Sequence, residues 1–273
     1  MTPRAQGTLS LMTEAVAVPA SSLPGGVEMP MIGFGTWQLR GRTGRQAVAT
    51  ALAAGYRHID TATMYGNESE VGRALADSGL PRESVFITTK LPSSRVGHER
   101  GTLAASLRAL GTDYVDLWLV HWPPAGRKLC EVWREFLVLR DDGRARAIGV
   151  SNYSLAQLDR LTEATGVTPA VNQISWSPAR YDPALLTGHA ERGVALEGYS
   201  PLKGAKLADP VLAGIATAHG VTPAQVVLRW HLEHGITVIP KSSHPDRIAA
   251  NIDVLGFKLT PDQVASIDAL SRV

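Results

Sequence analysis

The stretch that decides the fold runs from Ser84 to Trp122 and reads SVFITTKLPSSRVGHERGTLAASLRALGTDYVDLWLVHW. Its two ends, SVFITTKL and YVDLWLVHW, are short and largely apolar, as is typical of strands buried on both faces. Between them, ERGTLAASLRALG carries apolar residues at helical spacing and ends in glycine, which commonly follows a helix. A strand, a helix and a second strand in this order predict a parallel sheet.

The same alternation covers the chain from about residue 31 onward. The eight strand-like runs are MIGFGTW, YRHIDTA, SVFITTKL, YVDLWLVHW, ARAIGVSN, PAVNQISW, GVALEGYS and GITVIPKS. Helical patterns separate them, such as GRQAVATALAAG, NESEVGRALADSG, LCEVWREFLVLRDDG and SLAQLDRLTEATG. Two α/β folds fit this pattern, an open doubly wound sheet and a closed (β/α)8 TIM barrel.

Three observations favour the barrel. There are eight strand-like runs, the 273 residues suit one barrel, and no low-complexity linker divides the chain. SSLPGGVEMP predicts an N-terminal β-hairpin around Pro24, Gly25 and Gly26 that would plug the barrel floor. Two helical patterns follow the seventh strand-like run, so one helix is extra. We expect a flexible extension over residues 1–20 and a single barrel domain over residues 21–273.

Composition excludes several classes of function. Hydrophobic residues make up 44% and charged residues 19% of the chain, as in an ordinary soluble protein. The net charge of +2, without a block of Lys and Arg, argues against a nucleic-acid or membrane partner. One cysteine, Cys130, rules out an intrachain disulfide and a cysteine zinc cluster. Without a membrane-length apolar run or a clear signal sequence, we expect a cytoplasmic location.

Polar residues stand where the predicted strands end. Active sites of barrels form at this carboxyl end, so these side chains are expected to share one rim. They are Asp60, Tyr65, Lys90, His121, Ser151, Asn152, Asn172, Gln173, Tyr199, Ser200, Lys241 and Ser242. Taken alone, Asp60 and Tyr65 would be interpreted as a helix cap and a packed aromatic residue.

Together, Asp60, Tyr65, Lys90 and His121 suit the protonation of a carbonyl oxygen. An ordinary tyrosine has a pKa near ~10, and a nearby ammonium group favours its phenolate. A carboxylate can hold that lysine through a charge-assisted hydrogen bond, and a neutral histidine can orient the carbonyl. Because no side chain supplies a hydride, a cofactor must provide it.

Seven motifs in this order link the chain to a known family. GYRHIDTATMYGNESEVGRAL, TTKL, LVHWP, IGVSNY, VNQI, GYSPL and VIPKSS, followed by Arg247 and Asn251, resemble the aldo-keto reductases from about residue 27 onward. The length is most similar to compact bacterial members of the 2,5-diketo-gluconate reductase kind. This resemblance implies a (β/α)8 barrel that binds NADPH or NADP+ and reduces aldehydes or ketones to alcohols. It makes Tyr65 the general acid, Asp60 and Lys90 its tuners, and His121 the residue that orients the carbonyl.

The resemblance also implies the binding residues. Those for the cofactor are Gly35, Thr36, Ser151, Asn152, Gln173, Tyr199, Ser200, Leu202, Lys241, Ser242, Arg247 and Asn251. Ser151, Asn152 and Gln173 match positions that hydrogen-bond the carboxamide, and Tyr199 matches the ring that stacks on the nicotinamide. Lys241 and Arg247 suit the dianionic 2′-phosphate, which favours NADPH over NADH. Trp37 and Trp122 correspond to the substrate pocket.

Other motifs in the chain give weaker signals. GFGTWQ lacks the third glycine of a dinucleotide fingerprint. His231 and His234 have no third ligand in view, so we expect surface histidines and no metal site. The short WPPAGRKLCEVW segment and the end of the chain at Val273 predict an open, permissive pocket.

Two further classes of function stay open beside a monomeric reductase acting on small carbonyl compounds. A Schiff-base aldolase or lyase would use Lys90 as its nucleophile. A nucleotide-sensing protein would bind the cofactor without turnover, and it would need no proton donor. The aldolase or lyase differs from the reductase in the role of Lys90, and the nucleotide-sensing protein differs from it in having no catalytic role for Tyr65.

Overall fold

The computed structural model describes residues 18–126 and 128–271. A hairpin of β1 (Ala20–Leu23) and β2 (Val27–Pro30) precedes an eight-stranded sheet. That sheet consists of β3 (Phe34–Gly35), β4 (His58–Asp60), β5 (Phe86–Leu91), β6 (Val115–Val120), β7 (Ala145–Ser151), β8 (Val171–Ser175), β9 (Ala195–Tyr199) and β10 (Thr237–Val238). Its strands are all parallel and neighbour one another in chain order.

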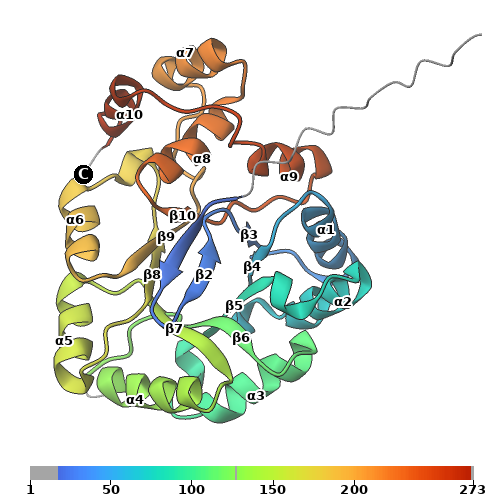
Figure 1. Cartoon of the computed structure of the whole chain (residues 1–273), viewed down its shortest axis with the longest axis vertical. Helices are drawn as coiled ribbons and strands as arrows, with labels where there is room; N and C mark the ends of the chain where they lie inside the picture. Colours follow the sequence, from blue (N-terminus) through green and yellow to red (C-terminus); the bar gives the residue numbers. More distant parts are fainter. Residues whose placement is uncertain (1–17, 127, 272–273) are drawn as a thin grey trace, which may run out of the picture.

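The sheet curls until its first and last strands meet (Figure 1). Ile32, just before β3, forms a parallel bridge with Val238 of β10. The amide of Gly33 donates to the Val238 carbonyl at 2.9 Å, and that of Gly35 donates to the Pro240 carbonyl at 3.0 Å. The expected (β/α)8 barrel is therefore confirmed, and the open doubly wound sheet is excluded.

Ten α-helices of the described residues surround the barrel. They are α1 (Gly41–Ala53), α2 (Glu68–Ser78), α3 (Glu99–Leu110), α4 (Lys128–Asp141), α5 (Leu155–Thr165), α6 (Pro183–Glu191), α7 (Pro210–His219), α8 (Pro223–Glu233), α9 (Pro245–Ile252) and α10 (Pro261–Asp268). The extra helix after the seventh barrel strand is present, since α7 and α8 both separate β9 from β10. Among the described residues, no single helix has the length and apolarity to cross a membrane; α7 and α8 meet that criterion only as a pair bent by 89°.

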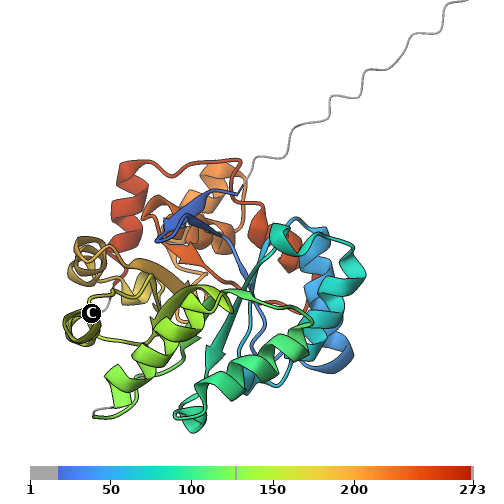
Figure 2. The same cartoon turned by 60° about the horizontal axis from the view of Figure 1, so that its bottom comes forward.

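The hairpin closes one end of the barrel, as predicted (Figures 1 and 2). Leu23, Val27 and Met29 of the hairpin are buried in one cluster with Phe86 and Leu117 of the barrel strands. The expected flexible extension over residues 1–20 lies outside the described residues as far as residue 17, and β1 already begins at Ala20. The other end of the barrel is left to the loops that follow the strands.

His231 shows where the sequence interpretation was wrong. It was expected at the surface, yet its side chain is fully buried and its Nδ1 donates to the Val227 carbonyl at 2.7 Å. The reason is that α8 lies beneath α7 and α10 and buries Val227 and Trp230 with them, so helix α8 is covered on more than one face. His234 is partly buried and pairs with Asp268 at 2.8 Å. In the described part of the chain, no group of three or more His, Cys, Asp or Glu residues is arranged to hold a metal ion.

Candidate active site

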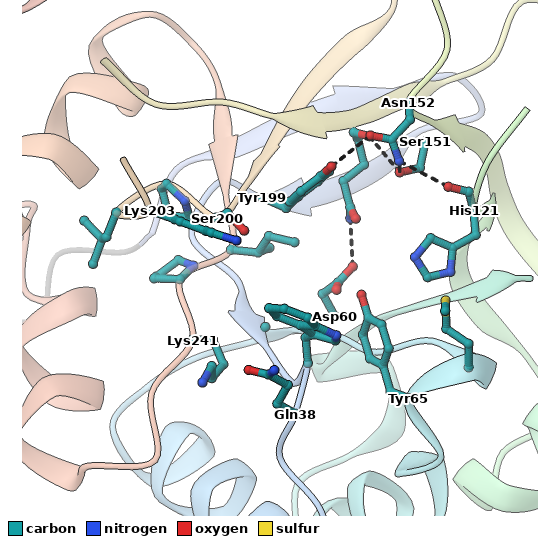
Figure 3. A pocket seen from close by; sticks show the side chains of 18 of the residues that line it. Gln38, Asp60, Tyr65, His121, Ser151, Asn152, Tyr199, Ser200, Lys203 and Lys241 are labelled. Atoms are coloured by element: carbon teal, nitrogen blue, oxygen red, sulfur yellow. Dashed lines mark hydrogen bonds between the residues drawn. The ribbon is translucent and has the colours of Figure 1, made fainter. Parts of the chain in front are cut away.

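A cavity of about 450 Å³ opens at the carboxyl end of the barrel strands (Figure 3). The predicted site residues that line it are Gly35, Trp37, Asp60, Tyr65, His121, Trp122, Ser151, Asn152, Gln173, Tyr199, Ser200, Leu202 and Lys241. They come from β3, β4, β7, β8 and β9 and from loops that follow the barrel strands, far apart in the sequence. Barrel closure brings them together, because the carboxyl ends of all eight strands face the same side.

The remaining predicted residues do not line this cavity. Lys90 and Thr36 are fully buried, and the Thr36 hydroxyl donates to the Asp60 carbonyl at 3.0 Å. Ser242 is buried with its Oγ accepting from the His244 amide, and Arg247 and Asn251 lie on α9. Arg247 is exposed, whereas Asn251 is buried.

Asp60 and Lys90 form a buried ion pair beneath the cavity. Asp60 ends β4, and Lys90 is the last residue but one of the neighbouring strand β5; their side chains are 2% and 0% exposed. Lys90 Nζ donates to both carboxylate oxygens at 2.6 Å and to the Thr61 carbonyl at 2.8 Å. Burial is the largest single effect and lowers the pKa of Lys90, but Asp60, together with Tyr65 and Glu197, outweighs it, so the pKa is raised. Lys90 is therefore a fixed ammonium group, whose charge is tolerated because it is paired.

Tyr65 lies on the cavity wall in a 3₁₀ turn, Thr63–Tyr65, which ends at Gly66 with a φ of 64°. Lys90 Nζ is 5.2 Å from the centre of its ring. The sequence predicts that this ammonium lowers the pKa of Tyr65. It does so, but burial has the larger effect, and the pKa is raised above 10.0. Tyr65 therefore keeps its proton at neutral pH, the state that a proton donor needs.

His121 lies next to Tyr65 on the cavity wall (Figure 3). The two rings meet edge to face with their centroids 5.8 Å apart. Burial, and then the charge of Lys90, lowers the pKa of His121 to about 3. The imidazole is therefore neutral near pH 7 and carries one N–H, which can donate to a carbonyl oxygen. Its Nδ1 is buried without a hydrogen-bond partner among the described residues.

A chain of hydrogen bonds forms the opposite wall (Figure 3). The Tyr199 hydroxyl donates to Asn152 Oδ1 at 3.0 Å, and Asn152 Nδ2 donates to Ser151 Oγ at 2.9 Å. Ser151 Oγ in turn donates to the Gln173 carbonyl at 2.8 Å. Asn152 has a φ of 64°, a left-handed conformation that few side chains other than asparagine adopt readily. These bonds hold the Tyr199 ring and the amide groups in fixed positions.

Some residues at the site were missed from the sequence. Gln38, Met64 and Lys203 also line the cavity, and Met64 is 56% exposed. Met64 precedes Tyr65 and Gln38 follows Trp37 in the chain, so their sequence positions indicated that they could line the same cavity. Glu197 is fully buried on β9 below Tyr199. Residues two positions apart in a strand lie on the same face, so Glu197 shares a face with Tyr199. An acidic residue at this position of an otherwise apolar strand was therefore a signal in the sequence for Glu197 as well.

Comparison with known proteins agrees with this geometry. The Aldo/keto reductase family matches residues 31–272. An aldo-keto reductase of Mycolicibacterium smegmatis is 50% identical over 257 residues, covering 92% of this chain and 93% of that protein. The 2,5-diketo-D-gluconic acid reductase B of a Corynebacterium species is 43% identical over 260 residues, covering 93% and 94%. The crystal structure of a Bombyx mori aldo-keto reductase in complex with NADP is 34% identical, with a TM-score of 0.88 and 94% of each chain covered.

The chain belongs to the aldo/keto reductase family. It is thus an oxidoreductase of a family that uses nicotinamide cofactors on small carbonyl compounds. The resemblance seen in the sequence, including that to the 2,5-diketo-gluconate reductases, is confirmed.

Proposed function

We propose that the protein is an NADPH-dependent reductase of aldehyde or ketone carbonyls, with Tyr65 as the general acid. The observation that carries the proposal is the placement of Tyr65 and neutral His121 side by side on one cavity, above the Lys90–Asp60 pair. A proton donor, a hydrogen-bond donor and a buried cation thereby converge where a carbonyl oxygen can reach them.

The residues around the cavity fit a nicotinamide cofactor. The Tyr199 ring is held by Asn152 beside the Ser151 hydroxyl, a flat surface next to groups that can hydrogen-bond a carboxamide. A Cβ on Gly35 would meet the Ile239 carbonyl at 2.9 Å, so the backbone at the cavity tolerates no larger residue there. Lys241 lines the cavity and Arg247 is exposed on α9, and these two cations support the proposed recognition of a 2′-phosphate. When bound, the cofactor supplies the hydride.

The side chains of this protein then supply the proton. His121 donates its N–H to the carbonyl oxygen and orients it, while the Tyr65 hydroxyl protonates that oxygen as negative charge develops on it. The phenolate left on Tyr65 is stabilised by the nearby Lys90 ammonium group. Asp60 fixes the ammonium group by accepting two of its three hydrogen bonds.

The Schiff-base alternative conflicts with the state of Lys90. A nucleophilic lysine must be neutral and accessible. Lys90 is 0% exposed, donates three hydrogen bonds to oxygen atoms, and has a raised pKa. A cofactor-sensing role without turnover would leave the Tyr65 and His121 pair without a purpose.

We also propose a monomer in the cytoplasm, built as one barrel domain over residues 21–273. The near-balanced charge and the absence of a Lys- or Arg-rich block in the sequence argue against a nucleic-acid or membrane-surface partner. Size-exclusion chromatography with light scattering tests the monomeric state, and a stable dimer mass would contradict it.

The function is tested with NADPH and NADH side by side against a panel of aromatic and aliphatic aldehydes. We expect NADPH to be oxidised, and Tyr65→Phe to lower kcat by about 10² to 10⁴, because one positioned proton donor is lost. The matched control is Tyr114→Phe, whose ring lies under Arg82 away from the cavity. NADPH binding, followed by fluorescence, should persist in both variants. Wild-type turnover in Tyr65→Phe would refute the assigned mechanism.

A further inference from the structure

A second carboxyl group is buried in the barrel beneath the site. Glu197, on β9, is 0% exposed. Its Oε2 accepts from Gln173 Nε2 at 2.9 Å, and the same Nε2 donates to Asp60 Oδ2 at 2.8 Å. The side-chain NH₂ group of Gln173 therefore donates to two carboxyl groups and links Glu197 to the Asp60–Lys90 pair.

The other oxygen of Glu197 has no hydrogen-bond partner. Glu197 Oε1 is buried and lies 3.6 Å from His58 Nε2. His58 Nδ1 is 3.1 Å from the Pro30 carbonyl, which only accepts, so Nδ1 carries the proton of a neutral imidazole. Nε2 then carries no hydrogen; it accepts from the Thr88 hydroxyl at 3.1 Å and lies 3.6 Å from Glu197 Oε1. An ionised Glu197 would place a negative oxygen against a nitrogen that has no hydrogen to offer, whereas a proton on Oε1 removes this repulsion.

The surrounding charges favour the same state. Among the described residues, Glu197 interacts with His58 and Asp60 from β4 and with Lys90 from β5. Burial, and then the negative charge of Asp60, raises the pKa of Glu197 to about 8, while Gln173 and Lys90 act the other way. Burial keeps His58 neutral by lowering its pKa. With Glu197 protonated, the cluster holds one anion and one cation and is neutral overall.

We propose that Glu197 acts as a neutral carboxylic acid and is a positioning residue that holds the Asp60 carboxylate, through Gln173, in line with Lys90 and Tyr65. If Glu197 were ionised, two carboxylates would compete for the single Lys90 ammonium group. That group would then stabilise the Tyr65 phenolate less, and Tyr65 would be a weaker acid. The effect on turnover rests on the proposed function, but the protonation of Glu197 does not.

Infrared spectroscopy tests the protonation without any turnover. In D₂O near pH 6, the difference between the wild type and Glu197→Gln should contain the C=O stretch of a protonated carboxyl group. The band should vanish with a midpoint near the pKa of about 8. Glu68 also has a pKa raised by burial, so Glu68→Gln serves as the control and must leave the Glu197 band in place. Absence of the band near pH 6 would overturn the neutral state.

Kinetics tests the positioning role. Glutamine at this position can accept from Gln173 and donate to His58, so Glu197→Gln should keep kcat within about twofold near pH 7. We expect kcat of the wild type to decline at alkaline pH as Glu197 ionises, and Glu197→Gln should lack this decline. Glu197→Met has similar length but offers Gln173 no good acceptor, and its kcat should fall about tenfold with KM within about twofold.

A Glu197→Met enzyme with wild-type kcat and pH profile would overturn the positioning role. The infrared band separates this result from a failure of the proposed function. A wild type that carries the titrating band but turns over no carbonyl compound would refute the reductase while leaving Glu197 protonated.

Discussion

At the scale of single residues, burial sets the protonation states of the site. Lys90 keeps its charge because Asp60 is paired with it, whereas His121 has no acidic partner and becomes neutral. Tyr65 lies between these cases, since burial holds its proton while Lys90 favours its release. The same four side chains in water would have ordinary pKa values and little tendency to cooperate.

His121 should make the protein sensitive to acid. Its pKa is about 3 in the folded chain, against an ordinary value of 6.5, so below about pH 6.5 the unfolded chain binds a proton that the folded chain does not. Stability is therefore lost as the pH falls. Relative to His121→Gln, we expect the wild type to lose about 3 kcal/mol of unfolding free energy between about pH 6.5 and 4.

Urea denaturation across this pH range measures the effect. The control is His244→Gln, since His244 is exposed and lies outside the site. A constant difference between the wild type and His121→Gln would show that His121 titrates normally. In the catalytic assay, titration of His121 should not affect kcat/KM between about pH 5 and 7. Any change in kcat/KM over this range should therefore persist in His121→Gln.

At the scale of elements, the chain marks the beginnings of its later helices clearly. Thr222 and Thr260 each accept from the backbone amide of a glutamine three residues on, while that glutamine bonds back to the cap. Proline follows each threonine at a position where a helix needs no N–H. Such local signals mark where α8 and α10 begin without reference to their packing.

Helix contacts are less visible in the sequence, and two helical glycines illustrate this. A Cβ on Gly72 of α2 would lie 2.6 Å from the Ala109 carbonyl of α3, whereas one on Gly101 of α3 would have nothing within 4 Å. Gly72→Ala should destabilise by about 1–3 kcal/mol through overpacking. Gly101→Ala should stabilise by about 0.5–1 kcal/mol through helix propensity. Denaturant titration of both variants decides, and equal effects would contradict the proposed contact between α2 and α3.

At the scale of the whole molecule, closure of the barrel and coverage of its floor support the site. The strand ends converge on one cavity only because β10 returns to the segment before β3. At the other end, the hairpin covers the barrel interior with apolar side chains. The Asp60–Lys90 pair and Glu197 thus lie in a closed interior, where electrostatic interactions are strong.

Met29 should measure the stability that this coverage provides. It is 0% exposed on β2, so Met29→Ala should cost about 2–4 kcal/mol by leaving a cavity under the barrel. Met64→Ala is the matched control, because Met64 is 56% exposed and should change stability by less than about 0.5 kcal/mol. Thermal or urea unfolding compares the two. Similar small losses would show that the hairpin is not a structural part of the barrel.

The sequence by itself determined the eight strands, most of the helices, the hairpin and the residue types at the strand ends. It could do so because periodicity, caps and turn residues act over a few neighbouring positions. The family, too, follows from short motifs in a fixed order. The roles of Tyr65, Asp60, Lys90 and His121 stay predictions that the kinetic tests must decide.

Only the tertiary structure decided which of these groups are buried, paired or neutral. His231 belonged to a pattern that looked exposed, and Glu197 was one acidic residue in an apolar strand, yet both are fully buried. The physical reason is that burial and charge state depend on neighbours from several strands and helices at once. For Glu197 these neighbours come from residues as distant as His58, Lys90 and Gln173, and only the closed barrel brings them together.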